Sequence, residues 1–588
     1  MPSDLPTTRR NKVGTSLRSG VPLERDEARH WLSEPATPRT MLGRMQRFWQ
    51  PLLVACVGVL GAQLWLMGHR SIAISVLGVA GLAVGLRLGT LLLRFCLSES
   101  VPLLAVARTM IEEALSTKLS VLLVVCVVLT LPVLPLLLDP GERLAYRVQF
   151  FLAWSLSIAS VMLSLLSIAL ACRSVSDDIE SNRIHMAFSK PLSRWEYLFG
   201  KWFGIALLDA LLVGLLGIAV YALTCALASS DALDANDRIA VDEQVLTARS
   251  VTLPTHPRGT EFDDAVEKTI ERIREDDPAA FEKDPAAARK RIFSQHIHEW
   301  HTVTSDVKSS FIFDGLNQNH INAPVVQLRL KPWAGNSGIS EAEVRFALWL
   351  NERPFPIRNG VHERYTVRQG TVQTIDVPIS FIDRHGQLKV TVANDNLRMP
   401  GEDFATSISF TPDDGMQVLH RVGGFSSNFC RGLLVIWAKL LLLTAAALAA
   451  GTWLGFPTAF LASLMVYVSA VANGFFADAV DIYTGFDRKT ATLTSMLQLR
   501  FRLLSERVLG LEWWEAIKTV GAYVADGFLG VIPSFGEYDS ISDLATGRVI
   551  PLTELSFCLF LLGTLYPLTL LAVGCLLLQR RDLVRASS

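Results

Sequence analysis

Long apolar blocks alternate with polar segments along this chain of 588 residues. A helix rises 1.5 Å per residue, so roughly 20 apolar residues cross the ~30 Å hydrocarbon core of a membrane. The blocks long enough to do so are Trp49–Met67, Ser71–Leu93, Ser120–Leu138, Val148–Cys172, Trp202–Leu227, Leu433–Leu454, Pro457–Phe475 and Leu555–Leu578. The pattern predicts a mainly α-helical polytopic membrane protein with about eight transmembrane helices.

The polar region 229–431 interrupts these blocks and has two kinds of pattern. Its first part, with "DDAVEKTIERIREDD", is charged and helical in spacing. Its second part alternates apolar and polar residues in "VVQLRLKPW", "EVRFALWL", "TVQTIDVPISFI", "GQLKVTVAN" and "TSISFTP". Alternation with period two is typical of half-buried strands. We therefore expect an inserted α+β domain that contains a β-sandwich at about 305–415.

Basic flanks predict the orientation, because Lys and Arg beside a span stay in the cytoplasm. They place both termini, and the connection between the fourth and fifth spans, in the cytoplasm, and they place 229–431 outside. The predicted parts are a disordered basic tail at 1–47, a transmembrane hairpin at 48–98, a first core half at 101–228, an extracytoplasmic domain at 229–431 and a second core half at 432–588. Outer-face helices are expected at 478–550.

Composition and charge exclude several functions. Half of the residues are hydrophobic and the net charge is −1, so bulk charge does not favour nucleic acid. The eight cysteines lie in or beside apolar blocks, without a CxxC pair. The "HIHEWH" stretch offers metal ligands, but no second ligand pair accompanies it, so surface histidines are the favoured interpretation. We expect no catalytic residues, no cofactor and no metal.

A charged stretch, "SVSDDIESNRIHMAFSKPLSRWEYLFGKW", joins the fourth and fifth spans. Ser174 and Ser176 are candidate N-caps, and the acids that follow suit the first turn of a helix. Lys190-Pro191 would end that helix, and Ser193 with Glu196 has the spacing of a capping box that starts another. The stretch predicts two short helices at 174–200 against the inner leaflet.

This stretch resembles the cytoplasmic coupling segment of ABC transporter permeases of the type-2 exporter class, with its acidic turn and its Ser-Lys-Pro-x-Ser-Arg run. Three further stretches resemble that family: "VARTMIEEALSTKL" as an interfacial helix before the third span, "GTWLGFPTAFLASLMVYV" as a tight hairpin and "CLLLQRRDL" as the C-terminal exit. The alternative for the first stretch is a simple polar extension of the third span. Ser181-Asn182 departs from the family's common Gly-Thr. The resemblance covers Val106–Leu583 without the extracytoplasmic domain.

The resemblance implies a six-helix permease core, a separate cytoplasmic ATPase subunit, a second permease copy or related permease, and a bacterial-type inner (plasma) membrane. Agreeing with a separate ATPase, the chain has no G-x-x-x-x-G-K-[ST] phosphate loop and is not expected to be an enzyme. The residues expected to couple to the ATPase are Asp177, Asp178, Glu180, Arg183, Lys190, Pro191, Arg194 and Glu196. The alternative is a self-capped helix pair that only joins two spans.

Besides Arg87 of the second block, two charges lie within predicted spans, Asp209 and Lys439. Such residues are functional candidates because charge is costly in lipid. We predict a buried pair that braces the fifth and sixth spans; the alternative is that each side chain reaches toward its nearer interface. For the whole protein, the alternative to an export permease is a membrane-anchored structural or adaptor protein whose outer β-domain binds an envelope component.

Overall fold

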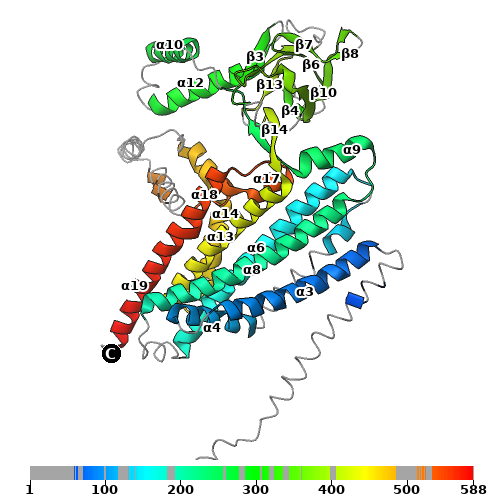
Figure 1. Ribbon diagram of the computed structural model, residues 1–588. Coiled ribbons are helices and arrows are strands. Elements are labelled where there is room, and N and C mark those ends of the chain that lie inside the picture. Colours follow the sequence, from blue (N-terminus) through cyan, green and yellow to red (C-terminus); the bar gives the residue numbers. More distant parts are fainter. Residues whose placement is uncertain are drawn as a thin grey trace, which may run out of the picture.

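The computed structural model describes most of the chain. The described ranges are 70–97, 101–116, 133–139, 141–181, 193–255, 260–276, 285–304, 307–316, 324–335, 343–358, 360–396, 406–412, 414–484 and 533–586, with isolated positions between 58 and 63, at 130 and between 513 and 524. A helix bundle and a separate β domain (residues 247–424) lie at opposite ends of this part of the molecule (Figure 1).

Six helices in the described part are long and apolar enough to cross a membrane. They comprise α3 (Arg70–Cys96), α6 (Leu144–Glu180), α8 (Arg194–Ala228), α13 (Phe425–Trp453), α14 (Phe456–Thr484) and the last span, formed by α18 (Leu552–Phe560), the π-turn η6 (Leu561–Leu565) and α19 (Tyr566–Ala586). They correspond to six of the eight predicted blocks. The blocks Trp49–Met67 and Ser120–Leu138 fall mostly outside the described residues, so the count of eight is not confirmed.

Helix α13 is the centre of the bundle and packs on α6, α8, α14 and α19. The core between these helices is mostly aliphatic, with Leu440, Ala445 and Leu448 at 0–1% exposure. Gly451 lets α13 approach α6, since a Cβ there would lie 3.2 Å from the Cys172 carbonyl oxygen. The expected tight hairpin between α13 and α14 is present, with Leu454 and Gly455 between the two helices.

Helix α4 (Pro102–Ser116) lies across the end of the bundle remote from the β domain, here called the far end (Figure 1). Its buried residues Ala107, Met110, Ile111 and Ala114 recur at the spacing of one helical face. That face rests on α8, where a Cβ at Gly204 would lie 2.7 Å from the Ala107 carbonyl oxygen. The amphipathic helix predicted before the third span is therefore present and begins slightly earlier. A short 3-10 turn, η1 (Leu134–Leu137), precedes α6.

The β domain contains two antiparallel sheets that share one core, as the alternation predicted. The first has the order β1-β14-β4-β11, and the second β10-β6-β12-β3 with β7 beside β6. The strands of these sheets are β1 (Thr247–Thr252), β3 (Lys308–Phe313), β4 (Val325–Leu330), β6 (Glu343–Leu350), β7 (Arg353–Phe355), β10 (Tyr365–Arg368), β11 (Gln373–Pro378), β12 (Leu388–Asn394) and β14 (Met416–Gly424). Because β1 and β14 lie at the two ends of the inserted region, the sheet extends beyond the predicted 305–415.

Smaller elements complete the β domain and its base. They are α9 (Ala235–Ala240), the π-turn η2 (Val241–Val245), α10 (Thr260–Asp276), α12 (Pro285–Trp300), β2 (Thr302–Val303), β5 (Pro332–Ala334), β8 (Ile357–Arg358), β9 (Val361–His362), η4 (Ile379–Phe381) and β13 (Ile408–Phe410). The predicted helical part is thus α10 and α12, which pack through Val266, Ile270 and Ile292.

The β domain joins the bundle through β1 and β14. Strand β14 ends at Gly424 and continues directly into α13, and β1 follows η2. The bundle adds a third connection from the segment between α17 (Ser540–Ala545) and α18: Arg249 N–H donates to the Gly547 carbonyl at 2.9 Å, and Val549 N–H donates to the Arg249 carbonyl at 2.9 Å. The short turn η5 (Gly536–Tyr538) comes just before α17.

Asp237 of α9 caps the start of α6 across a long sequence distance. Its carboxylate accepts the Leu144 N–H at 2.7 Å and the Ala145 N–H at 3.1 Å. Burial raises the pKa of Asp237, but the backbone N–H groups of Ala145, Leu144 and Leu233 outweigh it and hold the pKa below its ordinary value. The negative charge also suits the positive end of the helix dipole.

We expect Asp237→Ala to lower the free energy of unfolding by about 1–2 kcal/mol at neutral pH, because two N–H groups of α6 lose their acceptor. The folded pKa lies below the unfolded one. This stabilisation is therefore complete above about pH 4 and is lost as pH falls through the folded pKa. Unfolding of both proteins in detergent across pH measures it. Asp242→Ala, which breaks an exposed i,i+4 pair with Arg238, is the control and should cost at most about 0.5 kcal/mol. Equal losses from the two substitutions would contradict the capping role.

Candidate functional site

The charged stretch after the fourth predicted span does not start a new helix. Helix α6 runs unbroken through Ser174 and Ser176 to Glu180, and both serines are buried inside it. The prediction that Ser174 or Ser176 is an N-cap is therefore wrong, and the acids lie in the last turn of α6. Acids at that end oppose the helix dipole, so each needs another source of stability.

Two side chains of α8 stabilise the Asp178 carboxylate. The Lys201 ammonium lies 2.6 Å from Asp178 Oδ2, and the Tyr197 hydroxyl donates to the same oxygen at 2.7 Å. Lys201 also donates to the Ser174 carbonyl at 2.5 Å. The side chains of Lys201 and Asp178 are only 5% and 16% exposed. This buried ion pair ties the far ends of α6 and α8 together and leaves little of the Asp178 side chain exposed.

Lys201 is not among the coupling residues that the sequence pattern predicts. A signal was present: Tyr197 and Lys201 are four residues apart and share one face near the start of an apolar helix. A lysine that is placed within such a helix needs a partner. Which acid would supply it depends on how α6 and α8 pack.

The other predicted coupling residues divide by exposure. Asp177 forms an i,i+4 pair with Arg173 at 3.0 Å, with both side chains substantially exposed, and Glu180 is exposed. Arg183, Lys190 and Pro191 lie outside the described residues. Helix α8 begins after Ser193 with the predicted capping box: Ser193 Oγ accepts the Glu196 N–H, and Glu196 accepts the Ser193 N–H. Arg194 follows in the first turn and is partly buried.

Asp209 is completely buried between α6, α8 and α13. It accepts a hydrogen bond from the Ser167 hydroxyl at 2.8 Å and a longer one from Thr444 at 3.4 Å. Because these hydroxyl groups lie on α6 and α13, the Asp209 carboxyl of α8 connects three helices inside the bundle.

Lys439 is not the partner of Asp209. It donates to the Phe535 carbonyl at 3.1 Å and lies 5.3 Å from the centroid of the Phe535 ring. The predicted brace between the fifth and sixth spans is therefore wrong: the two charges are satisfied by different neighbours. The depth of Asp209 and of Lys439 in the membrane can be estimated from the sequence. The rotation of each helix about its axis, which decides whether the two side chains face each other, cannot.

Comparison with known families agrees with this helical arrangement. Residues 101–241 match the model of the ABC-2 family transporter protein. The matched segment contains α4, α6, the α6–α8 connection, α8 and α9. The resemblance seen in the sequence is thereby confirmed over residues 101–241, and the chain is a multi-pass membrane protein that is similar to ABC-2 transporters in this segment. No curated protein and no solved structure matches the chain.

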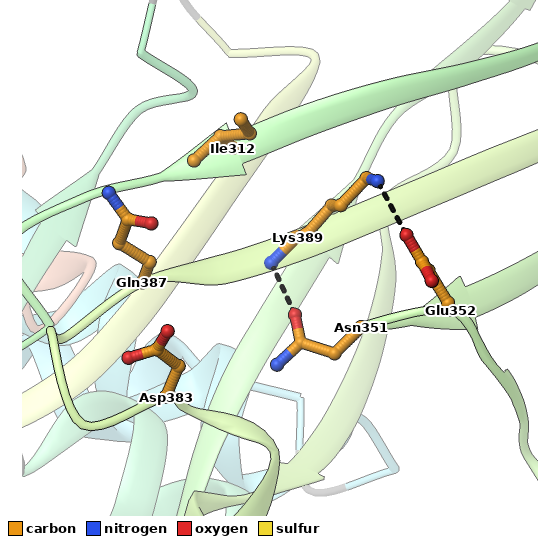
Figure 2. Close-up of a pocket in the computed structure, with 6 residues that line it drawn as sticks. All are labelled: Ile312, Asn351, Glu352, Asp383, Gln387 and Lys389. Carbon is orange, nitrogen blue, oxygen red and sulfur yellow. Dashed lines mark hydrogen bonds and ion pairs between the residues drawn. The ribbon is translucent and has the colours of Figure 1, made fainter.

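Outside the ABC-2 segment, the β domain has an open hollow of about 240 Å³. Its lining residues, shown in Figure 2, are Ile312, Asn351, Glu352, Asp383, Gln387 and Lys389. Lys389 Nζ pairs with Glu352 Oε1 at 3.0 Å, and the Lys389 N–H donates to Asn351 Oδ1 at 2.9 Å. This lining offers polar contacts but none of the serine, cysteine or histidine side chains that nucleophilic catalysis commonly uses.

Two histidines of the "HIHEWH" stretch, one in α12 and one just after it, have contacts within the domain. His296 contacts Thr269 of α10 at 3.3 Å, and His301 is buried with its Nδ1 atom 2.8 Å from the Ile297 carbonyl oxygen. Within the described ranges, no cluster of three or more histidine, cysteine or acidic side chains could hold a metal ion.

Proposed function

We propose that this chain is the permease subunit of an ATP-driven export complex and that a separate cytoplasmic ATPase subunit binds it. The observation that supports this most strongly is the ABC-2 match over α4, α6, the α6–α8 connection and α8. In this proposal the chain itself hydrolyses no ATP. The ATPase binds the coupling face, which we define as Arg173, Asp177, Glu180 and the connection 181–193.

The charges at the far end of the bundle support a cytoplasmic location for the coupling face. Arginines lie on several helices at that end, and the C-terminus lies at the same end (Figure 1). The described ones are Arg94, Arg108, Arg173, Arg194 and Arg580. Because basic residues beside spans stay inside, we propose both termini in the cytoplasm, the β domain outside and a bacterial-type inner membrane.

The buried pair of Asp178 and Lys201 supports a coupling role for this end. It joins the last turn of α6 to the first turns of α8, directly behind the exposed acids. A force that the ATPase applies to the α6–α8 connection would therefore move both spans together. Export by this route needs a second permease copy or a related permease, and the apolar outward residues of α14, Leu461, Met465, Val468 and Val471, are 52–63% exposed to lipid or to that copy.

We expect the double charge reversal Asp177→Lys/Glu180→Lys to reduce the amount of ATPase subunit that co-purifies with the chain at least about tenfold. Two exposed charges of an electrostatic contact change sign, and like-charge contacts across an interface cost several kcal/mol. Quantitative mass spectrometry of the complex purified in mild detergent measures the loss.

The matched control is Asp264→Lys/Glu271→Lys, which reverses two exposed acids on α10 of the β domain and should leave the ATPase bound. If both double variants retain the ATPase equally, the coupling face is elsewhere. If the wild type retains no ATPase, the anchored adaptor becomes the better function, since the β domain has a hydrophobic core of its own.

A further inference from the structure

Three arginines gather where the β domain meets the bundle. Alternate side chains of β4 point to opposite faces of the sheet: Val326, Leu328 and Leu330 enter the domain core, so Gln327 and Arg329 face away from it. Arg329 lies opposite Gln417 of β14, and the Gln417 side chain accepts a hydrogen bond from Arg548 at 3.2 Å. Arg249 of β1 reaches the same face and donates to Gln327 at 2.6 Å.

These guanidinium groups have neutral partners only. Arg249 is 7% exposed, and besides Gln327 it donates to the carbonyl oxygens of Gln244 and Thr546 at 2.9 and 2.8 Å. Among the described residues, no carboxylate forms an ion pair with Arg249, Arg329 or Arg548. Asp414 attracts the Arg329 guanidinium electrostatically, but its own ion pair is with Lys331, at 2.7 Å.

The cluster holds three positive charges, and its nearest acids, Asp414 beside Arg329 and Asp543 beside Arg548, act on it only at longer range than an ion pair. Burial lowers the pKa of Arg249 to about 10, with Arg329 and Arg548 adding to the effect by repulsion. The Nε atoms of Arg249 and Arg548 are buried and have no partner in the described part of the chain. Buried donors are nearly always satisfied in proteins, and an unsatisfied one calls for a missing water or ion.

We propose that Arg249, Arg329 and Arg548 form a phosphate-binding site between the β domain and the bundle. The ligand is a phosphate group, either of a phospholipid headgroup or of a soluble phosphorylated molecule. Guanidinium groups match phosphate in charge and in the spacing of their donors. Arg329 and Arg548 are only partly buried, so part of each side chain is accessible from outside the protein.

The position of the site suits a phosphate at headgroup depth. Arg548 precedes α18, and β14 leads directly into α13, so the cluster lies beside the ends of two spanning helices. A bound phosphate would contact both the β domain and the bundle, and it would relieve the repulsion that the arginines exert on each other. The site requires no ATPase and is therefore independent of the proposed export function.

The test compares thermal unfolding of the full-length protein in non-ionic detergent with dihexanoyl-phosphatidylglycerol, with sodium phosphate, and with sodium chloride at equal ionic strength. We expect a phosphate compound, but not chloride, to raise the melting temperature in a saturable way. Arg329→Gln/Arg548→Gln should weaken the apparent affinity at least about tenfold, as expected for lost charge-assisted hydrogen bonds. Arg368→Gln/Arg384→Gln, which removes two exposed arginines of the β domain, is the matched control and should bind as the wild type does.

Saturation by the lipid alone would identify a headgroup site, and saturation by inorganic phosphate as well would identify a site open to soluble ligands. Equal responses of the two double variants, or no response of the wild type, would overturn the proposal. The single variant Arg329→Gln separates loss of binding from loss of folding, because the Arg329 side chain donates no hydrogen bond to a described residue. It should weaken binding without lowering the melting temperature of the ligand-free protein; a lower melting temperature with unchanged affinity would show a purely structural role and overturn the site.

Discussion

Lys201→Met should lower the free energy of unfolding by about 3–5 kcal/mol, because it leaves the Asp178 carboxylate buried without its counter-charge. The pair is short, 2.6 Å, and nearly enclosed, and Tyr197 holds the same carboxylate oxygen. Unfolding by a denaturing detergent in mixed micelles measures the loss. We also expect weaker ATPase stimulation if the proposed coupling is correct, since α6 and α8 would no longer move together.

The matched control is Arg173→Met, which breaks the neighbouring pair with Asp177 at 3.0 Å. That pair is exposed, so its loss should cost no more than about 0.5 kcal/mol. The double variant Asp178→Leu/Lys201→Met should recover most of the stability, because replacing both partners of a buried pair by apolar groups is often neutral. Additive losses in the double variant would show that the two side chains act separately.

Gly547→Ala should lower the free energy of unfolding by about 3 kcal/mol and loosen the attachment of the β domain. Gly547 has φ +67°, which costs a residue with a Cβ roughly 1–2 kcal/mol. A Cβ there would also overlap the Gln244 carbonyl oxygen, a backbone atom that cannot turn aside. Relieving this overlap would disturb the Arg249–Gly547 hydrogen bond at 2.9 Å. Thermal unfolding and the rate of limited proteolysis between β domain and bundle measure the two effects.

Gly315→Ala separates backbone strain from overlap. Gly315 has φ +83° but nothing within 4 Å of the position of a Cβ. This substitution should cost only the strain of about 1–2 kcal/mol and should leave proteolysis at the junction unchanged. Equal effects of the two substitutions would mean that the contact between Gly547 and Gln244 is unimportant.

The sequence by itself determined the membrane-spanning character, six of the spans seen in the described part, the amphipathic α4 and the sandwich in the inserted domain. Each of these features depends on a local period or on the length of an apolar block. Such patterns arise because apolar side chains are buried against lipid or against a core, and this burial involves residues that are close in the sequence. The capping box at Ser193 and Glu196 was equally readable, because both its hydrogen bonds form within one turn. The family resemblance also needed only local motifs.

Only the tertiary structure decided which charges face which neighbours. Asp178, a predicted coupling residue, pairs with Lys201 inside the bundle, and Asp209 and Lys439, which were predicted to pair, have other partners. Strand β1 and the arginine cluster join residues from both ends of the inserted region and from the segment before α18. Helix rotation and domain contacts bring these residues together. They result from packing over the whole bundle, because a local pattern fixes which face of a helix is apolar but not which neighbour that face meets.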